Sequence, residues 1–213
     1  MRNIPVFTTE FGVASLILES IVGRKEAFIR IQSSLEPEHL LEEAAAFCRS
    51  CGAEHVYATG HEILEKYPLH TVILQLSAPI EAFGETDACL FPVQEHTAQT
   101  WRQIYNQRMA GVKNAAWMTE TAMKKLVKEG SAYFVHRNGV LLGIGKASGN
   151  EIDAVATVVP GSGETVMRAL ATLLTEDVVR LTVSDRNLPA LRLYERMGFL
   201  TVGEVSRWYQ IFR

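Results

Sequence analysis

The chain has 213 residues, of which 47% are apolar and 21% are charged, and its formal net charge at pH 7 is −3. This size allows one large domain or two small ones, and the composition supplies a packed core, which excludes a disordered chain. The slightly acidic balance gives no global basic field for nucleic acid. No run approaches the roughly 20 apolar residues that a membrane span needs. We therefore expect neither a nucleic-acid partner nor a membrane partner.

The N-terminus and the cysteines indicate a cytoplasmic protein. No continuous apolar stretch follows the first residues, so they do not form a secretory signal peptide. Three cysteines are an odd number and predict no disulfide framework. Cys48 and Cys51 have the spacing of a metal-binding pair, but no second pair follows and Cys48 lies on the apolar face of a predicted helix. We expect buried thiols and no metal site.

The first half of the chain alternates strands and helices in the order β-β-α-β-α-β. Apolar or alternating segments predict strands at 13–18, 27–31, 55–59 and 70–76. Pro37 opens a helix that ends at Gly52, and residues 62–67 predict a short second helix.

The short acidic segment 78–87 is punctuated by Pro79 and Gly84, and it predicts a linker that we place at residues 81–87. We therefore expect an N-terminal α/β lobe at residues 1–80 and a second domain at residues 88–213.

The second domain has the predicted order β-α-α-β-β-β-α-β-α-β. Asn138-Gly139 is a strong signal for a two-residue hairpin. The predicted strands lie at 89–93, 133–136, 140–146, 152–159, 178–183 and 202–212. The predicted helices lie at 95–109, 119–130, 164–174 and 187–197.

The stretch from Val178 to Phe199 combines an apolar strand, a polar turn and an amphipathic helix that ends at Gly198. It resembles the closing motif of the GCN5-related N-acetyltransferases (GNAT family), a strand followed by N-x-x-A-x-x-L-Y-x-x-x-G-F. The matching residues are Asn187, Ala190, Leu193, Tyr194, Gly198 and Phe199.

The resemblance covers about residues 89–213 and has definite implications. It implies an α/β fold with a GNAT-type mixed central sheet flanked by helices. It also implies an N-acetyltransferase that moves an acetyl group from acetyl-CoA, the cosubstrate, to an amine by direct attack. The acceptor would be a small molecule or a peptide.

The resemblance also assigns roles to single residues. Tyr194 would protonate the departing thiol of CoA, although a tyrosine packed for its bulk is the alternative. A main-chain N–H at Val158 or Val159 would bind the acetyl carbonyl, which makes Val159 a catalytic candidate. Asn187 would contact the pantetheine region of the cofactor, while as a helix cap it needs no further function.

The loop that binds pyrophosphate departs from the family pattern, Q/R-x-x-G-x-G/A. The residues expected to bind the cofactor here are Ser162, Gly163, Glu164, Thr165, Val166 and Met167. Ser162 replaces the arginine and remains a good N-cap, whereas Thr165 and Met167 replace glycines and add bulk. Glu164 stabilises the free helix but repels a bound pyrophosphate. We expect either weakened binding of acetyl-CoA or a loop with a variant geometry.

The acceptor site is less specific. Trp101 and Tyr105 lie in a helix that lines the acceptor groove in the family, and core packing is the alternative for both. Glu151 and Asp153 lie on a strand where some members carry a catalytic glutamate, and solvated charges are the alternative. The general base stays unassigned. The alternative function is a non-catalytic GNAT-like CoA-sensing or interaction module, and the final strand leaves pairing across a homodimer open.

A possible internal repeat links the two halves. The segment Leu64–Val72 (LEKYPLHTV) parallels Tyr194–Val202 (YERMGFLTV), and each follows a strand. One hypothesis is that the N-terminal half is a degenerate GNAT-like lobe with Leu64 in the place of Tyr194. The other is that two unrelated helix–strand units look alike over so short a stretch.

Overall fold

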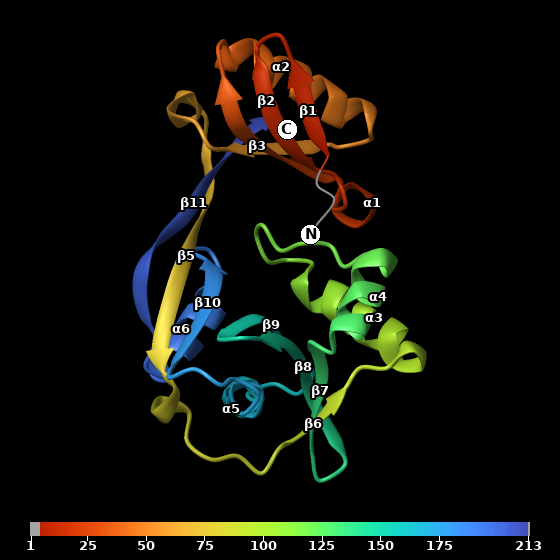
Figure 1. The fold of residues 1–213 in the computed structure, drawn as a ribbon, viewed down its shortest axis with the longest axis vertical. Helices are drawn as coiled ribbons and strands as arrows, with labels where there is room; N and C mark the ends of the chain where they lie inside the picture. Colours follow the sequence, from red (N-terminus) through yellow and green to blue (C-terminus); the bar gives the residue numbers. More distant parts are fainter. Residues whose placement is uncertain (1–4, 213) are drawn as a thin grey trace. The chain divides into compact units, whose positions relative to one another are not determined.

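A computed structural model describes residues 5–212 (Figure 1). These residues form two compact units: unit 1 holds residues 5–72 and 206–212, and unit 2 holds Ile73–Val205. The division differs from the expected lobes at 1–80 and 88–213. Two strands, β5 (Leu69–Pro79) and β11 (Leu200–Phe212), each contribute residues to both units. The assignment of domains itself stays a prediction.

Unit 1 contains a mixed sheet with the strand order β1-β2-β3-β4-β11. Strands β3 and β4 run parallel, and the other neighbours run antiparallel. The end of β11, for which pairing across a homodimer was left open, pairs with β4 of the same chain. The elements are β1 (Val6–Thr9), β2 (Gly12–Ile17), α1 (Ile21–Arg24), β3 (Glu26–Ser34), α2 (Pro37–Ser50), β4 (His55–Thr59) and the 3-10 helix η1 (Glu62–Lys66).

Helix α2 covers this sheet. Its sequence has an apolar face, and Leu40, Leu41, Ala44 and Cys48 of that face are buried in the core of unit 1. Burying a leucine side chain stabilises a fold by about 1.5–3 kcal/mol. The same burial raises the pKa of the Cys48 thiol to about 12. Cys51, in contrast, is exposed.

Unit 2 contains a mixed sheet with the order β5-β10-β9-β8-β7-β6. Helices α3 and α4 pack on one face, and α5 and α6 pack on the other (Figure 1). The elements are η2 (Ile80–Phe83), β6 (Cys89–Pro92), η3 (Glu95–Thr97), α3 (Ala98–Met109), α4 (Glu120–Glu129), β7 (Ala132–Arg137), β8 (Val140–Ser148), β9 (Glu151–Thr157), α5 (Gly163–Ala171), β10 (Val178–Ser184) and α6 (Leu188–Arg196).

Two glycines of β8 allow α5 to lie close against the sheet. A Cβ atom on Gly145 would clash with the side chain of Leu170, which is fully buried. A Cβ atom on Gly143 would lie 2.6 Å from the carbonyl oxygen of Ala156 and 3.0 Å from Val166. The position of α5 on the sheet therefore depends on the absence of side chains at these two residues.

The two halves of the chain repeat one order of elements. If the short helix α1 is left out, the first half has the series β1-β2-β3-α2-β4-η1-β5. After the elements η2 to α4, the second half has the series β7-β8-β9-α5-β10-α6-β11. In both series the first three strands pair antiparallel, and the third and fourth strands pair parallel. The final strand of each series then pairs with the fourth strand of the other, β5 with β10 and β11 with β4.

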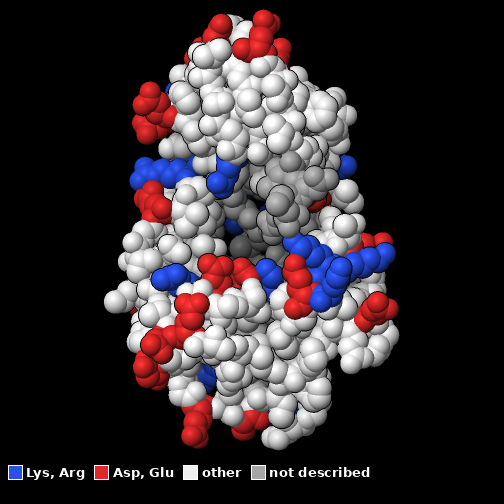
Figure 2. Space-filling model, viewed as in Figure 1, with Lys and Arg blue, Asp and Glu red and all other residues white. Residues whose placement is uncertain are grey.

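Acidic and basic side chains are interspersed on the face shown in Figure 2. Among the described residues, no helix combines the length and the apolar character that crossing a membrane would require.

Candidate functional site

The edges of β9 and β10 separate after a single point of contact. These parallel neighbours share the one register pair Arg180↔Glu151 among the described residues, and the Arg180 N–H donates to the Asn150 carbonyl at 2.8 Å. On its other side β10 is paired with β5 along its whole length, from Val178↔Pro79 to Ser184↔Ile73. The sheet therefore opens between β9 and β10 toward their carboxyl ends, which is where ligands bind in parallel α/β sheets.

The corresponding strands of unit 1 are closed. Strands β3 and β4 form five consecutive register pairs, from Glu26↔His55 to Arg30↔Thr59. Gly60, which follows β4, has a φ of +101°, and a Cβ atom there would lie 2.5 Å from the Ile31 carbonyl oxygen. The backbone at the carboxyl ends of β3 and β4 is thus in close contact, so an open edge exists in unit 2 and not between these strands.

Helix α5 begins at the open end, directly after β9. Ser162 occupies the N-cap position, but its side chain does not cap the helix, contrary to expectation. Its Oγ donates to the carbonyl oxygens of Leu142 and Val159 instead, at 3.0 and 2.7 Å. The first hydrogen bond of the helix runs from the Val166 N–H to the Ser162 carbonyl. The three N–H groups before Val166 therefore form the kind of helix N-terminus that binds phosphate.

The carboxylate of Glu164 is held away from this helix end. Its Oε1 accepts hydrogen bonds from the Nε and Nη2 of Arg168, one turn further along α5, at 3.2 and 2.7 Å. The expected repulsion between Glu164 and a pyrophosphate is therefore reduced by a neighbouring positive charge. Met167 does not add bulk at the loop either, because its side chain is fully buried in the core, as is that of Val166.

The predicted oxyanion donors are engaged elsewhere. The N–H groups of Val158 and Val159 both donate to the Leu142 carbonyl, at 2.8 and 3.2 Å. Successive peptide groups of a strand point in alternate directions, so the N–H groups that face β10 are those of Val155 and Thr157. We therefore correct the assignment of Val159: the main-chain donors along the open edge belong to Val155 and Thr157.

Tyr194 lies in the last turns of α6 with its ring half-buried. The ring packs 5.5 Å from that of Phe199, centroid to centroid, at the edge of the core of unit 2. Burial raises the pKa of the Tyr194 hydroxyl to about 12. No hydrogen bond to this hydroxyl occurs within the described part of the chain. The site thus contains a phenol that keeps its proton at neutral pH and has a free donor.

Helix α5 begins close to α6, because the first residue of α5, Gly163, has no side chain. Asn187 caps α6, with its Oδ1 accepting the Ala190 N–H at 3.4 Å. A Cβ atom on Gly163 would lie 2.8 Å from Leu193 Cδ2 and 3.7 Å from Thr157 Cγ2. The first residue of α5 therefore lies against both α6 and the end of β9, beside the residue that precedes Tyr194.

Two of the three predicted acceptor residues are buried, and the third lies at the other end of β9. Trp101 is fully buried, donates its Nε1–H to the Tyr133 carbonyl at 3.1 Å and stacks on the buried ring of Tyr105. Both aromatic residues are core residues of the α3–α4 face. Glu151 is exposed at the closed end of the β9–β10 pair, about 20 Å from Thr157 at 3.3 Å per residue. The nearby Asp153 forms an ion pair with Lys146 at 2.7 Å.

One residue at the open end was missed by sequence reasoning. Arg108, in the last turn of α3, donates from Nη2 to the Val158 carbonyl at 3.2 Å. This contact places an exposed cation beside the loop between β9 and α5. The sequence offers no signal for it, because a basic residue is common at the end of a helix.

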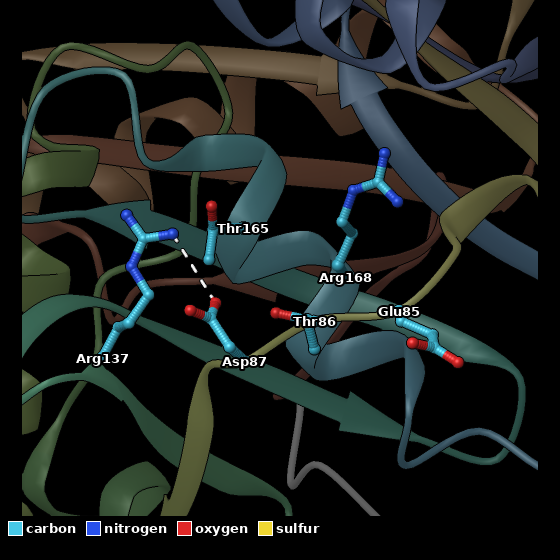
Figure 3. Close-up of a pocket in the computed structure, with 6 residues that line it drawn as sticks. All are labelled: Glu85, Thr86, Asp87, Arg137, Thr165 and Arg168. Carbon is cyan, nitrogen blue, oxygen red and sulfur yellow. Dashed lines mark ion pairs between the residues drawn. The ribbon is translucent and has the colours of Figure 1, made fainter.

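A polar pocket of about 370 Å³ lies on the flank of α5 (Figure 3). Thr165 and Arg168 come from α5, Arg137 comes from the end of β7, and the segment before β6 supplies the remaining side chains. Arg137 faces Asp87 of that segment at 3.6 Å. Both arginines of the pocket thus have acidic partners.

Comparisons with known proteins give a likeness in structure. No protein-family model matches the chain, and no curated protein matches it. A conserved protein of unknown function from Staphylococcus epidermidis superposes with a TM-score of 0.60 at 12% identity, over 99% of this chain and 94% of that one. A GCN5-related N-acetyltransferase from Anabaena variabilis gives 0.60 at 12% identity, over 97% and 58%. An acetyltransferase of the GNAT family from Colwellia psychrerythraea gives 0.50 at 13% identity, over 98% and 84%.

These identities are low enough that the likeness shows the fold alone. The fold is the mixed α/β architecture of the GCN5-related N-acetyltransferases, with a mixed sheet flanked by helices. The predicted fold class is therefore confirmed.

Proposed function

We propose that this protein is an N-acetyltransferase that moves an acetyl group from acetyl-CoA to an amine. The observation that carries the proposal is the separation of β9 from β10 after the Arg180↔Glu151 pair, with the uncapped start of α5 at the open end. The open edge provides main-chain donors for an extended amide chain such as pantetheine. The start of α5 provides N–H groups and a partial positive charge for the pyrophosphate.

The residues of the open edge would divide the chemistry between them. An N–H of Val155 or Thr157 would bind the thioester oxygen and stabilise the negative charge that develops there. The attacking amine forms the new C–N bond, the C–S bond breaks, and the proton lost by the amine ends on the departing sulfur. Direct attack of this kind needs no covalent intermediate on the protein.

Tyr194 would act on the departing sulfur as a hydrogen-bond donor. A pKa of about 12 keeps its proton in place at neutral pH, whereas a thiol has a pKa of about 8.5. Complete transfer from the tyrosine to the thiolate is therefore uphill, and donation stabilises the thiolate until the proton from the amine arrives. The acceptor amine is unassigned, as is the group that removes its proton.

One observation favours a second function, a CoA-binding module without catalysis. The N–H groups of Val158 and Val159, at the end of β9, are both occupied by the Leu142 carbonyl. A site without a well-placed oxyanion donor would still bind the cofactor. It would then transfer acetyl groups poorly or not at all.

Titration calorimetry separates these functions. Acetyl-CoA and CoA are titrated into the full-length chain, and the same protein is then assayed for release of free thiol with a panel of polyamines, amino acids and lysine peptides. Micromolar binding with thiol release supports the transferase. Binding without release from any member of the panel supports the module. Absence of heat and of competition by CoA would reject both.

We infer further that the N-terminal half is a degenerate copy of the GNAT-like lobe. The repeated order of elements and of pairing senses supports this inference. In that copy the short helix η1 stands in the place of α6, and β3 and β4 remain paired where β9 and β10 separate. Unit 1 would therefore serve the fold and bind no cofactor between these strands. The stoichiometry of acetyl-CoA binding in a calorimetric titration tests this, since more than one high-affinity site per chain would contradict it.

A further inference from the structure

Arg168 makes three hydrogen bonds that connect the first turn of α5 to another segment. Its Nε and Nη2 donate to a single oxygen of Glu164, at 3.2 and 2.7 Å. Its Nη1 donates to the carbonyl oxygen of Phe83, the last residue of η2. One guanidinium group thus joins the carboxylate of the first helical turn to the backbone of η2. Arg168 is also one of the residues that line the flank pocket (Figure 3).

The backbone next to Phe83 is shaped around this guanidinium. Gly84 has a φ of +62°, a conformation that favours glycine. A Cβ atom at Gly84 would lie 2.6 Å from Arg168 Nη1. The segment that precedes β6 therefore fixes the direction of the arginine, and the arginine fixes the direction of the glutamate.

The direction of the Glu164 carboxylate matters because of the helix end beside it. The start of α5 has no side-chain cap, since the Ser162 hydroxyl is bound to Leu142 and Val159. A carboxylate in the first turn is attracted by the free N–H groups of a helix N-terminus. Released from Arg168, Glu164 would move toward these N–H groups and compete with any phosphate for them.

We propose that Arg168 is a positioning residue that holds the Glu164 carboxylate on the flank of α5 and so keeps the start of the helix accessible to the pyrophosphate of acetyl-CoA. This proposal rests on the proposed function. It adds a specific cause for cofactor affinity in a loop that lacks the arginine and the glycines of the family pattern.

A double-mutant cycle tests the proposal. Acetyl-CoA is titrated into the wild type, Arg168→Gln, Glu164→Gln and the double variant. We expect Arg168→Gln to raise the Kd about tenfold, because an uncompensated charge then lies near the phosphates. In the Glu164→Gln background the same substitution should change the Kd by about twofold or less. The Kd for S-acetylpantetheine, which lacks the pyrophosphate, should not respond to Arg168→Gln.

Two further variants separate positioning from loss of charge and from loss of structure. Arg137→Gln removes the other cation of the flank pocket, whose ion pair is with Asp87, and should change the Kd by about twofold or less. Gly84→Ala retains every charge but displaces the guanidinium, and should reproduce part of the Arg168→Gln effect. Thermal unfolding of each variant monitors the fold.

Each outcome has a definite reading. Equal weakening by Arg168→Gln in both backgrounds, or equal weakening for acetyl-CoA and S-acetylpantetheine, overturns the positioning role while leaving the proposed function intact. An unchanged Kd in Arg168→Gln also overturns the positioning role and leaves the proposed function intact. If the wild type binds no acetyl-CoA, the proposed function fails and the role of Arg168 fails with it.

Discussion

Arg180 of β10 and Glu151 of β9 form the one register pair that joins these two strands among the described residues. The pair closes the sheet at the amino ends of the strands, and the rest of the facing edges is left open. The corresponding strands of unit 1 are joined by five such pairs. The same arrangement of parallel strands thus occurs in an open and a closed form within a single chain.

Gly163→Ala should weaken acetyl-CoA binding. The added Cβ would lie 2.8 Å from Leu193 Cδ2, so the first turn of α5 must move away from α6. We expect a Kd about five- to tenfold higher and a loss of stability of about 1 kcal/mol, typical of overpacking. Calorimetric titration and urea unfolding measure the two effects. Gly111→Ala is the matched control, because a Cβ there meets nothing within 4 Å, and an equal effect there would contradict the prediction.

Tyr194→Phe should lower the turnover of acetyl transfer while sparing cofactor binding. The phenylalanine retains the contact with Phe199 and removes only the donor to the departing sulfur. Loss of a positioned hydrogen-bond donor to a developing anion typically lowers rates by about 10²–10³-fold. The assay is thiol release with an amine identified in the screen, combined with the Kd for acetyl-CoA. Tyr133→Phe is the control, since that hydroxyl is bound to the Gly130 carbonyl, and an unchanged kcat in Tyr194→Phe would exclude the role.

The raised pKa of Tyr194 predicts a loss of stability at high pH. The pKa is about 12 in the folded chain and about 10 in an unfolded one. Between these values the unfolded chain has released the phenol proton and the folded chain has not, so stability is full below pH 10 and falls as the pH rises toward 12. Urea unfolding between pH 9 and 12 should therefore show a steeper decline for the wild type than for Tyr194→Phe. Parallel curves would contradict the buried position of this hydroxyl.

Gly145→Ala should destabilise unit 2. A methyl group at this residue of β8 clashes with the buried side chain of Leu170 on α5. Overpacking of a core in this way typically costs about 1–3 kcal/mol. Replacing Leu170 by valine in the same chain should restore part of the loss in a urea titration. If the double variant is less stable than both single variants, the two side chains do not share the space that we assign to them.

A fragment containing residues 88–213 should not fold cooperatively. It lacks the β5 residues Ile73–Pro79, which pair with β10 along its whole length. Without them β10 becomes an unpaired edge beside an incomplete core, and such edges aggregate. A longer fragment that begins at residue 69 should show a sharper thermal transition by circular dichroism and a single peak in size-exclusion chromatography. A cooperative transition in the shorter fragment would contradict the need for β5.

The sequence predicts most of the elements of this fold because their patterns are local. The hairpin at Asn138-Gly139, the helix expected at 119–130 and the helix opened by Pro37 are all confirmed. The expected boundary near residue 80 reflects the same local reasoning, since the acidic segment after Pro79 has the composition of a linker. The placement of β5 beside β10 could not be predicted, because it depends on pairing between residues about 100 positions apart.

The candidate site was predictable where a motif fixes a helix and not where contacts cross between elements. Asn187 caps α6 as its motif requires, and Tyr194 follows in the expected place. Which main-chain N–H groups of β9 face the open edge depends on the register between β8 and β9. That register gives the N–H groups of Val155 and Thr157. The neutralisation of Glu164 depends on a rotamer of Arg168 that Phe83 holds, and no sequence pattern reports it.

The exchange of final strands has a consequence for the time at which this protein can fold during its synthesis. In unit 1, β4 pairs with Tyr209, Gln210 and Phe212 of β11, so its partner is translated only after all of unit 2. At roughly 5–20 residues per second, the edge of β4 waits on the order of ten seconds at the ribosome. Synthesis of unit 1 therefore begins before that of unit 2, but its sheet can be completed only after unit 2 has been synthesised. During that interval the unpaired edge of β4 in the nascent chain would be accessible to chaperones and prone to aggregation.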